Sequence, residues 1–450
     1  MINNKYIISL QNKFLNLRSS ELKSRLMSGV FWSAFGGIFS RALMLFAFIV
    51  VARILGQETY GEFGIVRSTV NMFVIFAGFG LGMTATKHIA EYKNSDPERA
   101  SRILTLSALF AIVAASLIAI IVFSSSSWLA KNTINAPHLA NELKVGAFIL
   151  WVSAINGAQT GALVGFEAFR TIAKINIVVG FFSVISLIVG TYFNGLHGAV
   201  LALALNISIN WIINNYAIRQ ELKKYNMTIF TTDWWKERSV LWRFSLPATL
   251  GGLMVSPIIW LTGALLVNQP DGYNEMGIFD AANQWFMAIL FIPGLVGKIV
   301  LPILSNLNGD KNNIQYAKVL KFSLIVNGGV ALIVAFIVAW LAPWILGSYG
   351  EGFSEGYMVL VYLAFSAVLV SINNVVGQVM TSKGKMWTGL FFNALWALSM
   401  IIFSWYFITN GFGAEGLAIA YLISYGLHSF WQIIYVKYFL NLELKYTVPE

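Results

Sequence analysis

The stretch LMSGVFWSAFGGIFSRALMLFAFIVVA, residues 26–52, decides the fold class, because it is long and apolar enough to cross a bilayer as a helix. Its one charged residue, Arg41, lies near the middle. An arginine halfway across a membrane costs at least ~2.5–3.5 kcal/mol on insertion scales, and such a residue usually faces a bundle interior or a wet cavity. The charge therefore indicates a path for something anionic.

The composition of the whole chain agrees with a membrane protein. Of its 450 residues, 57% are hydrophobic and 11% are charged, and the mean hydropathy is +0.70, whereas soluble proteins carry about 25% charged residues. The chain has no cysteine and its four histidines lie far apart, so no metal site is predicted. It has no Walker A loop, GxGxxG, HExxH or Ser/His/Asp constellation, so we predict no catalytic residue and no enzyme activity.

Hydropathy and helix breaks predict an all-α polytopic protein with about twelve transmembrane helices. The predicted spans are residues 28–51, 60–83, 103–124, 142–165, 171–193, 197–217, 242–267, 277–304, 317–342, 357–381, 386–408 and 414–436. The first span does not have the form of a signal peptide, because the polar and basic segment 1–27 precedes it and no small-residue cleavage site follows. We expect this segment in the cytoplasm, as an amphipathic helix along the membrane surface.

Basic residues set the orientation of these spans. With the N-terminus in the cytoplasm, 24 of the 30 lysines and arginines fall in cytoplasmic segments, and three fall in outer loops. By the positive-inside rule, both termini are predicted to be cytoplasmic. The same distribution accounts for the net charge of +10 without a nucleic-acid partner.

Three sequence matches indicate an internal duplication. YGEFGI from Tyr60 matches YNEMGI from Tyr273, and two glycine pairs recur at nearly the same spacing: residues 36–37 with 251–252, and GLHG from Gly195 with GAEG from Gly413. Two six-helix halves then run the same way through the membrane, as in transporters that hold substrate between their halves and alternate access by rocking. The predicted segments are 1–27 (cytoplasmic), 28–218 (first bundle), 219–241 (cytoplasmic linker), 242–440 (second bundle) and 441–450 (cytoplasmic tail).

Charged residues inside the spans are the first candidates for the central cleft. Arg67 and Asp280 each follow a matched tyrosine by seven residues, so they occupy equivalent positions in the two halves. Opposite charges there predict a pair that closes an outer gate, although Asp280 also suits a plain interfacial charge near a helix N-terminus. Lys298 lies toward the cytoplasmic end of its span, where it either attracts an anionic headgroup or snorkels to the surface.

Four residues of the seventh span are candidates for a hinge. Pro247, Gly251, Gly252 and Pro257 lie close together in it. Proline kinks or breaks a helix, either as a hinge or as a static bend for packing.

The chain resembles the polysaccharide (O-antigen) flippases of the multidrug/oligosaccharidyl-lipid/polysaccharide (MOP) exporter superfamily. The resemblance lies in LWRFSLP (241–247), IFDAANQW (278–285), VLPILS (300–305), FWS with Gly36 in the first span, and RILG (53–56) followed by Tyr60 and Gly61. It implies a MATE-like fold of two bundles around a central cavity in a bacterial inner membrane. It also implies the flipping of undecaprenyl-diphosphate-linked oligosaccharide repeat units from the cytoplasmic to the periplasmic leaflet, with Arg41 and Lys298 as our candidates for holding the diphosphate.

Further expectations follow from this resemblance. We expect no cofactor, with an ion gradient as a candidate driving force, and a functional monomer whose partners are the lipid-linked oligosaccharide, membrane lipids, and a polysaccharide polymerase with its chain-length regulator. Amide side chains in both halves are candidate contacts for sugar hydroxyls, or else they join helices by hydrogen bonds. They are Asn156, Gln159, Asn373, Asn374 and Gln378.

Two other transporters of the superfamily and one enzyme class are the alternatives. A cation-coupled multidrug antiporter is expected to carry an acidic residue deep in the first or seventh span, where this chain has none. A lipid II flippase tends to have fourteen spans and several arginines in the first. A membrane glycosyltransferase, polymerase or ligase commonly needs a large outer loop or soluble domain.

Overall fold

The computed structural model describes residues 21–245, 254–309 and 313–438, and all regular structure within these ranges is helical. The first half comprises α2 (Glu21–Leu55), α3 (Gln57–Gly78), α4 (Leu81–Tyr92), α5 (Pro97–Asn132), η2 (Pro137–Leu139), α6 (Ala140–Gly165) and α7 (Phe169–Lys224). Two short turns, η3 (Trp234–Glu237) and η4 (Leu241–Ser245), lead to the second half. That half comprises α9 (Val255–Val267), α10 (Gly272–Ile289), α11 (Phe291–Gly309), α12 (Asn313–Gly347), η5 (Phe353–Gly356), α13 (Tyr357–Ser382), α14 (Met386–Thr409) and α15 (Gly413–Tyr438).

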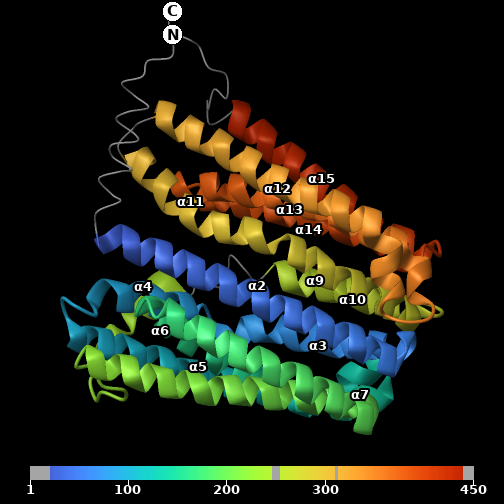
Figure 1. Cartoon of the computed structure of the whole chain (residues 1–450), viewed down its shortest axis with the longest axis horizontal. Coiled ribbons are helices and arrows are strands. Elements are labelled where there is room, and N and C mark those ends of the chain that lie inside the picture. Colours follow the sequence, from blue (N-terminus) through green and yellow to red (C-terminus); the bar gives the residue numbers. More distant parts are fainter. Residues whose placement is uncertain (1–20, 246–253, 310–312, 439–450) are drawn as a thin grey trace, which may run out of the picture.

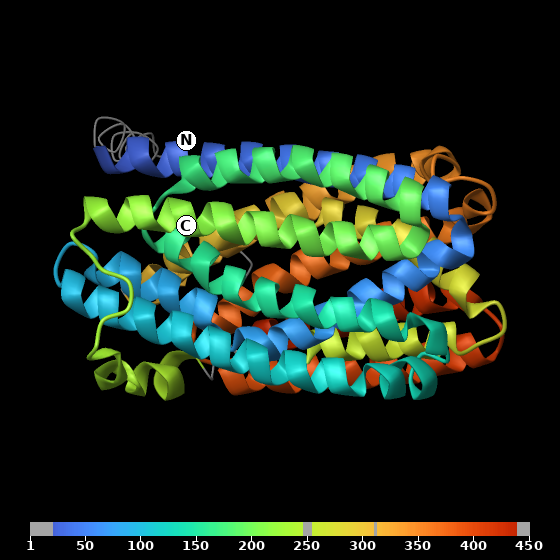
Figure 2. The same cartoon turned by 90° about the horizontal axis from the view of Figure 1, so that it is seen from below.

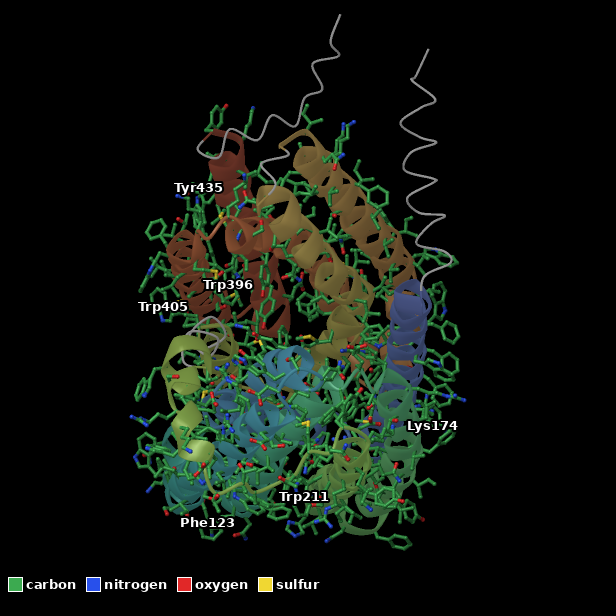
Figure 3. All side chains as sticks on the ribbon, turned by 90° about the vertical axis from the view of Figure 1, so that its left-hand side faces the viewer. Phe123, Lys174, Trp211, Trp396, Trp405 and Tyr435 are labelled. Atoms are coloured by element: carbon green, nitrogen blue, oxygen red, sulfur yellow. The ribbon has the colours of Figure 1, made fainter. Side chains whose placement is uncertain are left out.

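The helices form two bundles that lie side by side (Figure 1). Helices α2 to α7 make the N-terminal bundle, and α9 to α15 make the C-terminal bundle, with α2, α3, α9 and α10 between them. Seen from one end, the two bundles occupy opposite halves of the molecule (Figure 3). In that view Trp396, Trp405 and Tyr435 lie on the C-terminal bundle, and Phe123, Lys174 and Trp211 lie on the other.

Helix α7 contains two of the predicted spans, because the chain reverses inside it. Asn194 and Gly195 leave the helical conformation, and Gly195 has a φ of +53°, which glycine adopts readily. The hydroxyl of Ser186 donates to Oδ1 of Asn206 at 2.8 Å. A straight helix would separate these two residues by about 30 Å, so the two arms are antiparallel, as Figure 2 shows.

The predicted number of spans agrees with the described helices. By length and apolarity, nine of the described helices can cross a membrane, or ten when α3 and α4 count as one bent span. Helix α7 counts once there although it has two arms, and α9 is shorter because it follows residues 246–253, which lie outside the described ranges. The predicted all-α fold of about twelve helices is therefore confirmed.

The structure differs from the predicted boundaries in three places. Helix α2 already begins at Glu21, and α7 continues to Lys224, so both extend into segments predicted as cytoplasmic. The predicted surface helix at the N-terminus falls largely on residues 1–20, outside the described part of the chain. Two predicted spans are each built from two helices, because α3 and α4 are separate, as are α10 and α11.

The segment between the bundles is fixed to the N-terminal one. The Glu237 carboxylate of η3 accepts from Arg99 and from Arg102 of α5, each at 3.3 Å. Further on, the hydroxyls of Ser245 and Thr84 are 2.7 Å apart. The linker up to Ser245 is therefore tied to the N-terminal bundle.

Candidate functional site

Arg67 and Asp280 form an ion pair between the two bundles. Nη1 of Arg67, on α3, donates to Oδ2 of Asp280, on α10, at 3.0 Å. The two side chains are 19% and 8% exposed, so the pair is largely shielded from water. With its amide oxygen turned toward Arg67, Gln284 accepts from both terminal nitrogens at 3.0 and 3.1 Å. The structure thus brings together the two residues that the duplication marked as equivalent, while their role as a gate stays a prediction.

Small residues let α3 and α10 approach closely enough for this pair. A Cβ added at Gly64 would lie 3.0 Å from Cβ of Asp280, and one added at Gly61 would collide with the carbonyl oxygen of Tyr273. Gly277 is the counterpart of Gly64 in α10, and a Cβ added there would collide with the carbonyl oxygen of Gln57. Any larger side chain at these positions would push the two bundles apart.

The end of the molecule beyond this pair is closed. Four hydrogen bonds join the bundles there: Arg53 Nε to Ser348 O (2.6 Å), Gln57 Nε2 to Asn274 O (3.2 Å), Asn268 Nδ2 to Thr133 O (2.8 Å) and Tyr273 OH to Ile134 O (2.7 Å). Tyr60 of α3 packs with Tyr349 and Phe353 of the other bundle and with Phe63 of its own helix. The ring centroids of these four residues are 5.7–6.2 Å apart, and each residue is at most 1% exposed. We call this region, with the Arg67–Asp280 pair, the outer seam.

Arg41 lies where the two bundles face each other. Its guanidinium is 4.5 Å from the centre of the Phe291 ring on α11, and Nη1 lies 3.4 Å from the carbonyl oxygen of Met287, a weak hydrogen bond. Gly37, one turn earlier, is packed against the same ring. Within the described part of the chain Arg41 has no acidic partner, so most of its five donors are available to another anion.

Several other predicted residues are placed only in part. The backbone of Lys298 belongs to α11, but its side chain lies outside the described residues, as do Pro247, Gly251 and Gly252. Pro257 sits in the first turn of α9, where proline is tolerated without a kink. The hinge and the second diphosphate contact stay predictions.

Most of the predicted amides join helices to one another. Asn214 of α7 donates to Oδ1 of Asn156 at 2.6 Å, and Ser429 of α15 donates to Oδ1 of Asn373 at 2.7 Å. Gln159, with its amide oxygen toward Trp211, accepts from the indole at 3.2 Å. These contacts favour the interhelical alternative for these three residues. Of the other two, Asn374 is exposed, and Oε1 of Gln378 is buried without a partner in the described structure.

The bend of the second span, between α3 and α4, was missed by the sequence prediction. Helices α3 and α4 meet at an angle of 45°, at Phe79 and Gly80, which both have positive φ. Helix α10 gives way to α11 at Leu290, shortly before Pro293. Among the described residues the second half shows no such bend, because Gly272–Gly297 counts as one continuous span. Gly78 and Gly80, on either side of Phe79, carried the signal of the bend in the first half.

The described fold is that of a multi-pass membrane protein built from two helical bundles. The structure is similar to the solved inward-facing conformation of a multidrug resistance MATE family transporter, with a TM-score of 0.75, 15% identity, and coverage of 90% of this chain and 96% of the other. It is also similar to the outward-facing conformation of a multidrug resistance MATE family transporter, with a TM-score of 0.70 and 16% identity, over 93% of this chain and 96% of the other. Identities this low show the fold alone.

The sequence comparisons give the family. A model of the polysaccharide biosynthesis protein family matches residues 26–308, more than half of the chain, so the protein belongs to that family. It is 22% identical to the EPS I polysaccharide export inner membrane protein EpsE of Ralstonia solanacearum, over 86% of this chain and 88% of the relative. It is also 22% identical to the putative O-antigen transporter of Shigella flexneri, over 83% of this chain and 82% of that relative. The predicted family is confirmed, and the named relatives are transport proteins.

Proposed function

We propose that this protein flips undecaprenyl-diphosphate-linked oligosaccharide repeat units from the cytoplasmic to the periplasmic leaflet by alternating access. The family and the named relatives support the coarser statement that it is a polysaccharide exporter of an inner membrane. The observation that supports the proposed lipid-linked substrate is the position of Arg41. This cation has no carboxylate partner in the described structure and lies where the two bundles meet.

The chemistry of the substrate explains why such a residue is needed. A diphosphate with attached sugars cannot cross hydrocarbon unaided, because its charges and hydroxyls would lose their water. An arginine between the bundles replaces part of that hydration with strong charge-assisted hydrogen bonds to phosphate. The polyprenyl tail stays in the lipid beside the bundles. Lys298, nearer the cytoplasmic end of α11, is the second cation for the headgroup.

Alternating access assigns roles to the two ends of the bundle interface. The outer seam is the closed gate of the described conformation, and the Arg67–Asp280 pair must separate for release to the periplasm. The excess of basic residues puts both termini in the cytoplasm. A cationic residue at the bundle interface also disfavours the multidrug antiporter alternative, because a cationic drug would be repelled.

Restoration of surface glycan tests the proposal. In a host that lacks this protein, the unchanged chain should restore glycan display and Arg41→Ala should abolish it, while Arg41→Lys keeps part of it, because the charge survives without the planar fork. Arg219→Ala, which removes an exposed arginine at the cytoplasmic end of α7, is the matched control. All variants must reach the membrane in equal amounts. Normal display with a correctly inserted Arg41→Glu protein would exclude Arg41 as the diphosphate contact.

A further inference from the structure

A cavity of about 370 Å³ lies between helices of the N-terminal bundle, and its lining includes Met44, one turn along α2 from Arg41. It is enclosed by α2, α3, α6 and both arms of α7, and its wall is mostly apolar. The polar residues that line it are Arg67, Asn71, Ser153, Ser183, Asn206 and Asn210. No described lining residue is acidic. Its size and its few polar groups are typical of a site for a small polar ligand.

Asn206 indicates what such a ligand must offer. It is 7% exposed, and its Oδ1 accepts from the hydroxyl of Ser186 at 2.8 Å. Its Nδ2 is buried and has no hydrogen-bond partner in the described structure. A buried donor without an acceptor is unfavourable, so the cavity is suited to an occupant that presents an acceptor oxygen to Asn206.

Arg67 connects this cavity to the outer seam. It lines the cavity and also bonds to Asp280 of the C-terminal bundle. Its guanidinium lies 4.3 Å from the centre of the Phe48 ring, which lines the cavity too. An acceptor that enters the cavity therefore draws on the same guanidinium that holds Asp280.

We propose that this cavity binds one sugar unit of the lipid-linked glycan, through acceptor oxygens that face Asn206 and Arg67, and that its occupation weakens the outer seam. The inference rests on the proposed function. It adds a binding site for the glycan and a way in which glycan binding affects the gate. A ligand shifts a conformational equilibrium only by its differential affinity for the two states. Here the difference comes from Arg67, which is released from Asp280 when the seam opens.

Two lipid probes separate this site from the diphosphate contact. Undecaprenyl diphosphate and undecaprenyl diphosphate-N-acetylglucosamine differ in the sugar alone, and their binding to the purified full-length protein can be compared by native mass spectrometry. The unchanged protein should bind the sugar-bearing lipid about fivefold more tightly, as expected for one or two added hydrogen bonds. Asn206→Leu, and Ser153→Phe, which fills the cavity from α6, should both remove that preference without changing the binding of undecaprenyl diphosphate. Asn132→Leu, at the exposed end of α5, is the matched control and should keep the preference.

The outcomes distinguish the two proposals. If the unchanged protein binds neither lipid, the proposed function fails. If it binds both lipids equally, or if both cavity variants keep the preference for the sugar, the cavity is not the sugar site and the proposed function stands. Loss of the preference in both variants, with binding of undecaprenyl diphosphate intact, supports the cavity.

The link to the outer seam needs a second measurement. The chain has no cysteine, so nitroxide labels can be attached at Lys131→Cys and Glu351→Cys, exposed positions at the outer ends of the two bundles. The sugar-bearing lipid should lengthen the distance between the labels in the otherwise unchanged protein and leave it unchanged with Asn206→Leu. An unchanged distance in both proteins would overturn the coupling to the gate.

Discussion

The two ends of the bundle interface are built differently. At the outer end, hydrogen bonds, four packed rings and an ion pair join one bundle to the other. At the opposite end, the ion pairs that involve Lys93 or Glu237 stay within the N-terminal bundle or join it to the linker. The comparison teaches that the contacts of the outer seam join one bundle to the other, whereas these ion pairs at the opposite end hold the N-terminal bundle and the linker together.

Reporter fusions test which end faces outward, and the expected signal is all or none. The linker begins after Lys224, and Gly350 lies between α12 and η5 at the end that we assign to the periplasm. A phosphatase reporter, which is active only outside the cytoplasm, should be inactive at Lys224 and active at Gly350. Activity at both positions, or at neither, would break the comparison, because the seam would no longer face away from the basic end.

Among changes in the outer seam, reversal of one charge should have the largest effect on export. Arg67→Asp places a second carboxylate beside Asp280, and an uncompensated buried charge costs about 3–5 kcal/mol. Glycan display should fall at least ~10-fold at equal expression, since ~1.4 kcal/mol already corresponds to tenfold in an equilibrium. The double variant with Asp280→Arg should regain part of the activity. A double variant as inactive as the single one would leave Asp280 as an interfacial charge only.

A methyl group on α3 should weaken the seam without any change of charge. Gly61→Ala pushes against the backbone of Tyr273, and overpacking of this kind costs about 1–3 kcal/mol. We expect a severalfold loss of glycan display. The control is Gly78→Ala on the same helix, where an added Cβ meets no atom within 4 Å. Equal activity of the two variants would show that close approach of α3 and α10 is not required.

The linker contact at the inner end should matter for stability more than for transport. Glu237→Gln weakens the bonds from Arg99 and Arg102, so the linker should detach more easily, at a cost of roughly 1–3 kcal/mol. Trypsin applied to inside-out vesicles should then cleave the linker faster, with export nearly unchanged. Asp233→Asn, which removes only an exposed pair with Lys236, should have little effect. A loss of export as large as that of Arg67→Asp would contradict the difference between the two ends.

The sequence predicted the parts of this structure that depend on composition and repetition. Hydropathy located the spans because each must satisfy its backbone within a helix. The duplication aligned Arg67 with Asp280, and the two lie 3.0 Å apart. The charge of Arg41 indicated an interface position because a lone cation is costly in lipid.

The missing parts depend on which helices become neighbours. Hydropathy gives the length of an apolar segment and not the direction of its helix axis. It therefore cannot show the bend between α3 and α4 at Phe79 and Gly80. Asn206 is one of several amides on α7, and only the packing of four helices leaves its Nδ2 buried at a cavity without a partner in the described structure. Asn156 and Asn373 were candidates for sugar until their interhelical partners were known.

The four rings of the outer seam have a consequence for the energy supply of the cell. Tyr60, Phe63, Tyr349 and Phe353 fill the seam with at most 1% exposure each, and a dry apolar constriction of this kind blocks ions. A transporter for a large polar cargo needs a wide path, which would discharge the membrane if it were open at both ends. Under the proposed alternating access, the rings close the far end while the cargo enters, so that protons and small cations have no continuous water to follow. The membrane potential would then be preserved through each cycle of transport.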